Sequence, residues 1–191
     1  MEIYFLIENE GKLYTLWRIK MSQAHSHSLT AYRCIFSYLE YNNPIDTDEM
    51  KEKIKNGEKP NYSLTSFMHD YISVASSPII AKSADKVIQL TQIASSTSLP
   101  DNVTRIHIQP QVGKYGEPVT VVERDKNRIN KFGKNDPALY DYNVFFYEQN
   151  NDIIVIFYRK GTSGCKTAFI ETANVTLRAK GMKLEMSLIL H

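Results

Sequence analysis

The sequence predicts an α+β protein, with a mixed or largely antiparallel sheet built from hairpins and with helices packed on one face. Two observations lead to this class. Segments rich in aromatic and β-branched residues stand in pairs around turn residues near both ends of the chain, and segments with helical apolar spacing lie between them. The 191 residues are 42% hydrophobic and 23% charged, which excludes disordered, collagen-like and coiled-coil chains.

The chain begins with a predicted β-hairpin. Residues 2–8 and 11–20 are rich in aromatic and β-branched residues, and Asn9-Glu10-Gly11 separates them. Gly11 can adopt positive φ in a tight turn. Apolar residues occur on both faces of the second arm, so we expect a helix to pack on one of them.

Four helical segments are predicted in the first half. Residues 29–41 follow a candidate N-cap, Ser28, and carry apolar residues at helical spacing. Acidic residues precede basic ones within 45–61, which indicates a short solvated helix and a loop. Apolar residues at helical spacing also predict helices over 63–75 and 83–95.

The polar run Ser95-Ser96-Thr97-Ser98, followed by Pro100, is the candidate domain boundary. It divides the chain into residues 1–98, a hairpin plus a helical subdomain, and residues 99–191, a β-rich subdomain. The length also fits one compact domain.

The second half is predominantly β. Turn residues separate its apolar segments, and Gln149-Asn150-Asn151 between two of them is a strong hairpin signal. The predicted elements are strands at 105–112 and 118–124, a basic and partly helical connection at 124–134, strands at 142–148 and 152–159, a short helix at 165–174 and a strand at 183–190.

The charge is balanced, with 23 Lys and Arg against 21 Asp and Glu, so nucleic-acid binding would need a local patch. Cys34 and Cys165 lie far apart without metal or disulfide spacing, which favours a reducing, cytoplasmic location. The N-terminus lacks the features of a signal peptide, and no apolar run approaches 18 residues, so we expect no membrane insertion.

The most informative functional feature is the basic segment at 122–134, which holds five Lys and Arg and two acids. Arginine can bind a phosphate through two parallel hydrogen bonds, side-chain amides can contact bases, and Phe132 can stack on a base. A second basic group follows the strand at 152–159. We therefore predict a nucleic-acid-binding patch, with a solvated loop as the alternative. Its residues are Arg124, Lys126, Arg128, Lys131, Lys134, Arg159, Lys160 and Lys166.

The segment Gly161-Thr-Ser-Gly-Cys-Lys-Thr167 lies between a predicted strand and a predicted helix. It is too short for a phosphate-binding P-loop, which needs four residues between its glycines and a lysine directly after the second. Amides at the start of the helix, with Lys166 nearby, can still hold a phosphate oxygen. The alternative is a glycine-containing turn without a ligand.

The sequence shows no catalytic signature, so an enzyme is not favoured and no cofactor is expected. His25 and His27 could share a strand face, but no third ligand follows at a suitable spacing, so we expect a solvated loop rather than a metal site. Glu123 and Asp125 would share a face only on a continued strand, and they keep a metal-dependent nuclease or toxin as a third hypothesis. His107 should point away from its apolar neighbours.

Residues 103–190 resemble a known group of proteins in their order of elements and hydrophobic pattern. The hairpin NVFFYEQNNDIIVIFYRK, a glycine-containing turn, a short helix holding AFI and the closing strand KLEMSLIL carry the likeness. This layout resembles Rex-type phage-exclusion proteins and the N-terminal part of Kiwa-type phage-defence proteins. The resemblance implies a non-enzymatic component of prokaryotic antiviral defence or of a prophage, which senses nucleic acid or binds a partner. No site residues follow from it.

The second functional hypothesis is a protein-interaction subunit, either a homodimer or part of a larger defence complex. It would use exposed strand edges and tyrosines, which are common interface anchors. A sheet facing the core is the alternative explanation for the aromatic residues concerned, Tyr140, Tyr142, Phe145, Phe146 and Tyr147.

Overall fold

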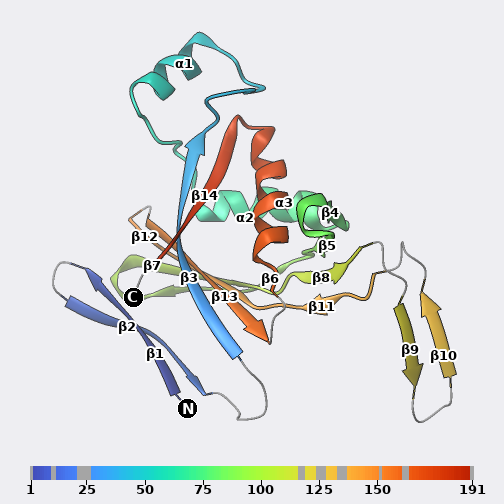
Figure 1. The fold of residues 1–191 in the computed structure, drawn as a ribbon. Helices are drawn as coiled ribbons and strands as arrows, with labels where there is room; N and C mark the ends of the chain where they lie inside the picture. The colour runs from blue at the N-terminus through green and yellow to red at the C-terminus, as the bar shows by residue number, and fades with distance from the viewer. Residues whose placement is uncertain are drawn as a thin grey trace.

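The computed structural model describes residues 28–115, 137–150, 152–159 and 164–189 with their side chains. It also describes the backbone of His27, of Lys160 and of four strands at 2–9, 12–20, 119–123 and 128–132 (Figure 1). Within these residues the protein is α+β, with three α-helices and two larger antiparallel sheets. The predicted fold class is therefore confirmed.

The larger sheet has six strands in the order β14-β3-β13-β12-β7-β6, and every neighbouring pair is antiparallel. β3 lies between β13 and β14, which makes it an interior strand. The strands are β3 (His27–Tyr38), β6 (Ile93–Leu99), β7 (Val103–Ile108), β12 (Val144–Gln149), β13 (Asp152–Lys160) and β14 (Met182–Leu188).

The smaller sheet has four strands in the order β11-β8-β5-β4. These are β4 (Ile79–Ala81), β5 (Lys86–Gln89), β8 (Gln111–Lys114) and β11 (Tyr140–Asp141). Two separate hairpins complete the β structure. They are β1 (Glu2–Asn9) with β2 (Lys12–Lys20), and β9 (Val119–Glu123) with β10 (Arg128–Phe132).

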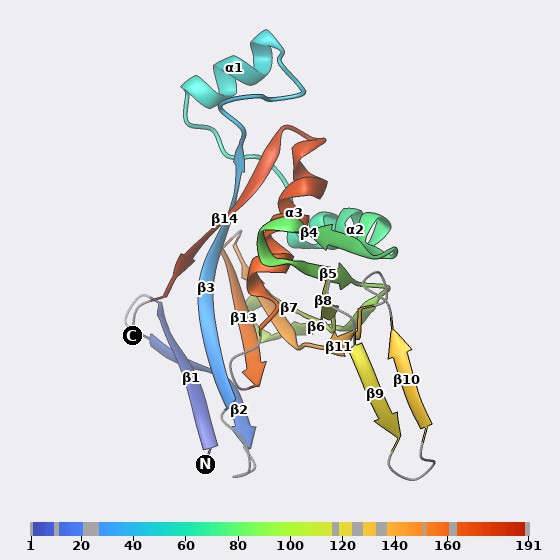
Figure 2. The same cartoon turned by 45° about the vertical axis from the view of Figure 1, so that its right-hand side comes forward.

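The three helices differ in how much they bury. α1 (Asp48–Lys55) has no buried residue, and Figures 1 and 2 show it beyond the ends of β3 and β14. α2 (Leu64–Ala75) and α3 (Lys166–Arg178) each bury an apolar face. Two short 3-10 helices, η1 (Lys82–Ala84) and η2 (Pro100–Asn102), connect strands.

The core lies between the six-stranded sheet and these two helices. Phe67 and Tyr71 of α2 contact Phe169 of α3 with centroid distances of 6.3 and 5.1 Å, and Phe169 also meets Phe146 and Phe157 of the sheet. Residues of β5 and β8 belong to the same buried cluster. Figure 2 shows α2 and α3 on the same side of the large sheet, so helices cover one face as predicted.

The predicted helix over 29–41 is wrong, because this segment is strand β3. Cys34 and Phe36 are buried beneath the helices, whereas Ala31 is buried on the opposite face. An interior strand with apolar residues on both faces produces a spacing that imitates a helix. Pairing with β13 and β14 decides its conformation.

The predicted helix over 83–95 is also wrong. Its residues form part of η1, all of β5 and the beginning of β6. The polar run Ser95–Ser98 is not a linker, because it lies in β6 and pairs with β7. The six-stranded sheet takes strands from both sides of residue 98, so the two predicted subdomains share this sheet.

The predicted strand over 105–112 is wrong as one element, because it divides at Gln109-Pro110 into β7 of the larger sheet and β8 of the smaller sheet. Proline has no amide hydrogen to donate to a strand ladder.

The remaining predicted elements are confirmed in outline. Both predicted hairpins form, and the helices over 45–61 and 63–75 appear as α1 and α2. The last helix is longer than predicted, since α3 continues to Arg178. The 124–134 connection contains β10, so residues 128–132 are extended rather than helical. The expected helix over the second arm of the first hairpin concerns side chains outside the described residues.

Candidate functional site

A cavity of about 300 Å³ lies where α3 begins beside the end of β13. Three cationic side chains line it, from β5, β13 and the first turn of α3, and three hydroxyl-bearing side chains from β3 and α3 accompany them. They are Lys86, Arg159, Lys166, Thr30, Tyr32 and Thr167.

Lys166 and Tyr32 form one wall of this cavity. The Lys166 Nζ donates a hydrogen bond of 3.1 Å to the Tyr32 hydroxyl and lies 4.2 Å from the centroid of its ring. The ring packs edge-on against Phe157, which holds the phenol in place. Because the phenol oxygen accepts from the ammonium, its own hydrogen can be donated to a ligand.

Lys86 approaches from the smaller sheet. Its Nζ donates a 2.7 Å hydrogen bond to the carbonyl oxygen of Gly164, which ties β5 to the turn before α3. A Cβ atom at position 164 would lie only 3.1 Å from Cγ of Arg159. Gly164 therefore lets the Arg159 side chain lie against the turn, and its carbonyl orients Lys86.

The first turn of α3 adds positive potential to the cavity. Cys165 is the N-cap and makes no side-chain capping hydrogen bond, whereas Thr47 and Ser63 cap α1 and α2. The N-terminal amides of a helix carry partial positive charge. Lys166 and Thr167 of this turn line the cavity.

The cavity is suited to an anion. Its described lining residues include three cations and no carboxylate. Cys165 also lines it, but burial raises the pKa of its thiol to about 12. A thiol with that pKa stays neutral and is a poor nucleophile. The arrangement therefore favours electrostatic capture over covalent chemistry.

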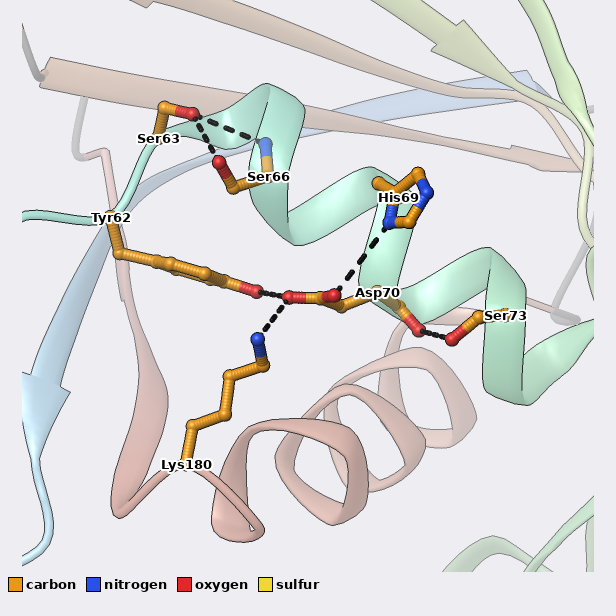
Figure 3. Close-up of polar contacts among 7 residues, drawn as sticks. All are labelled: Tyr62, Ser63, Ser66, His69, Asp70, Ser73 and Lys180. Atoms are coloured by element: carbon orange, nitrogen blue, oxygen red, sulfur yellow. Dashed lines mark hydrogen bonds and ion pairs between the residues drawn. The ribbon is translucent and has the colours of Figure 1, made fainter.

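A second polar cluster joins α2 to the residues that follow α3 (Figure 3). The Asp70 carboxylate accepts hydrogen bonds from the Tyr62 hydroxyl and from Lys180 Nζ, the latter at 2.8 Å. His69 Nδ1 lies 3.7 Å from the same carboxylate. The Lys180 ammonium, with the Tyr62 hydroxyl, holds the pKa of Asp70 below its usual value, while burial and Asp70 raise the pKa of Tyr62.

The contacts of the second cluster support a structural role, because they join α2 to the residues that follow α3. Asp70 stays ionised and Tyr62 stays protonated near neutral pH, so neither side chain is prepared to exchange a proton. The cluster instead links two helices that both cover the large sheet.

The structure brings two of the eight predicted nucleic-acid-binding residues together, Arg159 and Lys166. Lys160 ends β13 opposite His27, with its side chain outside the described part. Arg128 and Lys131 lie on β10, where the register sets Arg128 across from Glu123. Figures 1 and 2 show the β9–β10 hairpin apart from the beginning of α3. Arg124, Lys126 and Lys134 lie outside the described residues.

Sequence reasoning missed Lys86, Tyr32 and Thr30, although all three line the cavity. The helical spacing predicts helices for both segments, and a helix would place these side chains on different faces. The alternation of Thr30, Tyr32, Cys34 and Phe36 in β3 was the signal that could have placed Tyr32 on the helix-covered side.

The remaining candidates do not form a site in the described part of the chain. None of its His, Cys, Asp and Glu residues form a group of three or more that could hold a metal ion. Side chains of His25, His27, Glu123 and Asp125 lie outside that part. His107 points away from buried Ile106 and Ile108 as predicted, and it stacks on Phe145 with a centroid distance of 4.4 Å.

The five aromatic residues proposed as interface anchors differ in burial, and Tyr142 and Phe145 are half-buried. Phe146 and Tyr147 are buried, whereas Tyr140 is 62% exposed. None of the described helices is both long enough and apolar enough to span a bilayer.

The fold and the cavity together define an α+β protein with a cationic cavity at the beginning of a helix. No family model matches the chain, and no curated protein or solved structure matches it.

Proposed function

We propose that this protein is a non-enzymatic nucleic-acid-binding or sensing component that captures phosphate groups by electrostatic attraction. One observation carries the proposal: Lys86, Arg159 and Lys166 converge on one cavity whose described lining contains no acid. The resemblance of residues 103–190 to Rex-type and Kiwa-type proteins supplies the context of antiviral defence or a prophage.

A site of this kind has a characteristic salt dependence. Phosphate contacts release condensed counterions, and the logarithm of the affinity falls by roughly 0.7 to 0.9 per contact for each logarithm of salt. Three contacts therefore give a slope of roughly −2.1 to −2.7, or an affinity loss of roughly 20- to 40-fold between 50 and 200 mM salt.

Filter-binding titrations of single- and double-stranded DNA and RNA at several salt concentrations test this proposal. We expect Lys166→Gln and Arg159→Gln each to weaken binding to every sequence and to reduce the salt slope by about one. The matched control is Lys55→Gln on exposed α1, which removes the same charge far from the cavity. The double variant Arg124→Ala, Arg128→Ala measures the contribution of the basic segment.

Unchanged affinity and slope in both cavity variants would refute the assignment of the cavity. A loss confined to the Arg124, Arg128 double variant would move the binding surface to that segment. Circular dichroism of each variant confirms that the fold is retained.

A second candidate function, a protein-interaction subunit, is favoured by the outer edge of β6. This strand pairs only with β7 among the described strands, and its residues 94–98 are exposed and uncharged. Such an edge lacks the charges that usually block strand addition. Light scattering at two salt concentrations should then show a salt-independent oligomer that Thr97→Lys dissociates, whereas a monomer at both concentrations would remove this candidate.

A further inference from the structure

The size of the cavity limits what it can hold. Its volume of about 300 Å³ lies at the lower end of the range for ligand pockets, roughly 300–1,000 Å³. Proteins that follow a strand along its backbone use extended grooves, with roughly 4–16 nucleotides for each binding fold. The volume is sufficient for one phosphorylated unit, and the rest of a bound strand would lie outside the cavity.

The charge of the cavity indicates which phosphate it prefers. A phosphodiester within a strand carries one negative charge, whereas a phosphate monoester carries about −1.5 to −2 near pH 7. Lys86, Arg159 and Lys166 all face this space. Three cations attract a doubly charged group more strongly than a singly charged one, and this attraction is what would favour a monoester.

The donors also suit a phosphate at the end of a strand. They come from β3, β5, β13 and α3, and so approach from several directions. Lys86 and Lys166 each donate once to a described acceptor, Gly164 O and Tyr32 Oη, and an ammonium has three hydrogens. A monoester presents three terminal oxygens to such donors, whereas a diester presents two and needs a path for the chain on both sides.

We propose that this cavity recognises the terminal phosphate monoester of a nucleic-acid strand, with the Tyr32 hydroxyl as one of its donors. This inference rests on the proposed function and makes it specific, because the protein would sense strand ends rather than internal backbone.

The test compares one labelled oligonucleotide in three forms, with a 5′-phosphate, with a 3′-phosphate or with hydroxyls at both ends. We expect one phosphorylated form to bind at least about tenfold more tightly than the hydroxyl form, which corresponds to one additional charge-assisted hydrogen bond. Tyr32→Phe keeps the ring against Lys166 and Phe157 but removes the donor, so it should reduce this preference about three- to tenfold. Tyr140→Phe, at an exposed position outside the cavity, is the matched control.

The outcomes separate this inference from the proposed function. Equal affinity for the three forms, with salt dependence and sensitivity to Lys166→Gln retained, would overturn end recognition and leave nucleic-acid binding intact. Absence of binding at low salt would overturn both. A free nucleoside monophosphate that competes as well as the phosphorylated oligonucleotide would overturn the requirement for a strand and identify a mononucleotide ligand.

Discussion

Gly113 shows how one residue constrains the smaller sheet. It is buried in β8, and a Cβ atom there would lie 2.3 Å from the backbone carbonyl oxygen of Ala138. Only a glycine allows this close approach, because the obstacle is backbone rather than a side chain that can rotate away. The sequence pattern predicted a strand that ends at residue 112, so it indicated neither the place of Gly113 inside β8 nor this contact.

We expect Gly113→Ala to destabilise the fold by at least about 1–3 kcal/mol, the usual cost of overpacking a buried position. Urea denaturation followed by circular dichroism measures this loss. Gly57→Ala is the control, since Gly57 has positive φ but open space around it, and this variant should lose only about 1–2 kcal/mol through backbone strain. Equal losses in the two variants would contradict the steric explanation.

At the same scale, the cavity was only partly predictable. Arg159 and Lys166 stood out because they flank glycines between a strand and a helix. Lys86 and Tyr32 could not be added by inspection, since they lie 80 and 134 residues from Lys166 in the sequence. Their contribution depends on β3 and β5 reaching the start of α3.

At the scale of elements, the Asp70–Lys180 ion pair fastens α2 to the residues that follow α3. The pKa of the Asp70 carboxyl is lower in the folded protein than in the unfolded chain, so the ionised carboxylate stabilises the fold above about pH 4. This stabilisation is lost as the pH falls through the folded pKa.

We expect Asp70→Asn to lower the free energy of unfolding at pH 7 by about 1 kcal/mol or less, because both partners are partly exposed. The difference from the wild type should shrink as the pH falls below about 4, the unfolded pKa, and should disappear only below the lower folded pKa of Asp70. Urea titrations at pH 7 and pH 3 provide the measurement, and Asp46→Asn, whose partner is exposed Lys51, is the control. A difference that is the same at both pH values would show that charge is not responsible.

The predictions were correct for elements that have a single apolar face. α2 buries Leu64, Phe67, Met68 and Tyr71 on one side, which is the pattern of an amphipathic helix. The helix predictions for β3 and β5 were wrong because both strands bury apolar residues on both faces. Cys34 and Ala31 lie on opposite faces of β3, and the adjacent Val87 and Ile88 of β5 are both buried. Periodicity cannot separate a buried strand from a helix when neither face is polar.

At the scale of the whole molecule, one buried cluster connects both sheets with α2 and α3. It contains Cys34 from β3 and Cys165 from the start of α3, which are 2% and 1% exposed. Burial raises the pKa of each thiol to about 12. Their reactivity therefore reports on the opening of this shared core.

We expect neither thiol to react with a disulfide reagent at pH 8 in the native state, and both to react over the same urea range. The variants Cys34→Ala and Cys165→Ala each leave one thiol as the reporter. The urea concentration at half-maximal labelling is compared between them, after each value is referred to the unfolding midpoint of the same variant. Because Cys34 belongs to residues 1–98 and Cys165 to 99–191, separate midpoints would show that the two predicted subdomains unfold independently.

Sequence patterns alone were sufficient to predict the α+β class, the two hairpins, the amphipathic helix α2 and the cationic character of the turn before α3. These features depend on local spacing, turn residues and composition, all of which involve residues close together in the sequence. Contacts between distant segments establish that β3 is a strand between β13 and β14, and that Lys86 and Tyr32 join Arg159 and Lys166 around one cavity. Strand pairing and the cavity both bring together residues that are distant in the sequence. Local periodicity contains no information about such contacts.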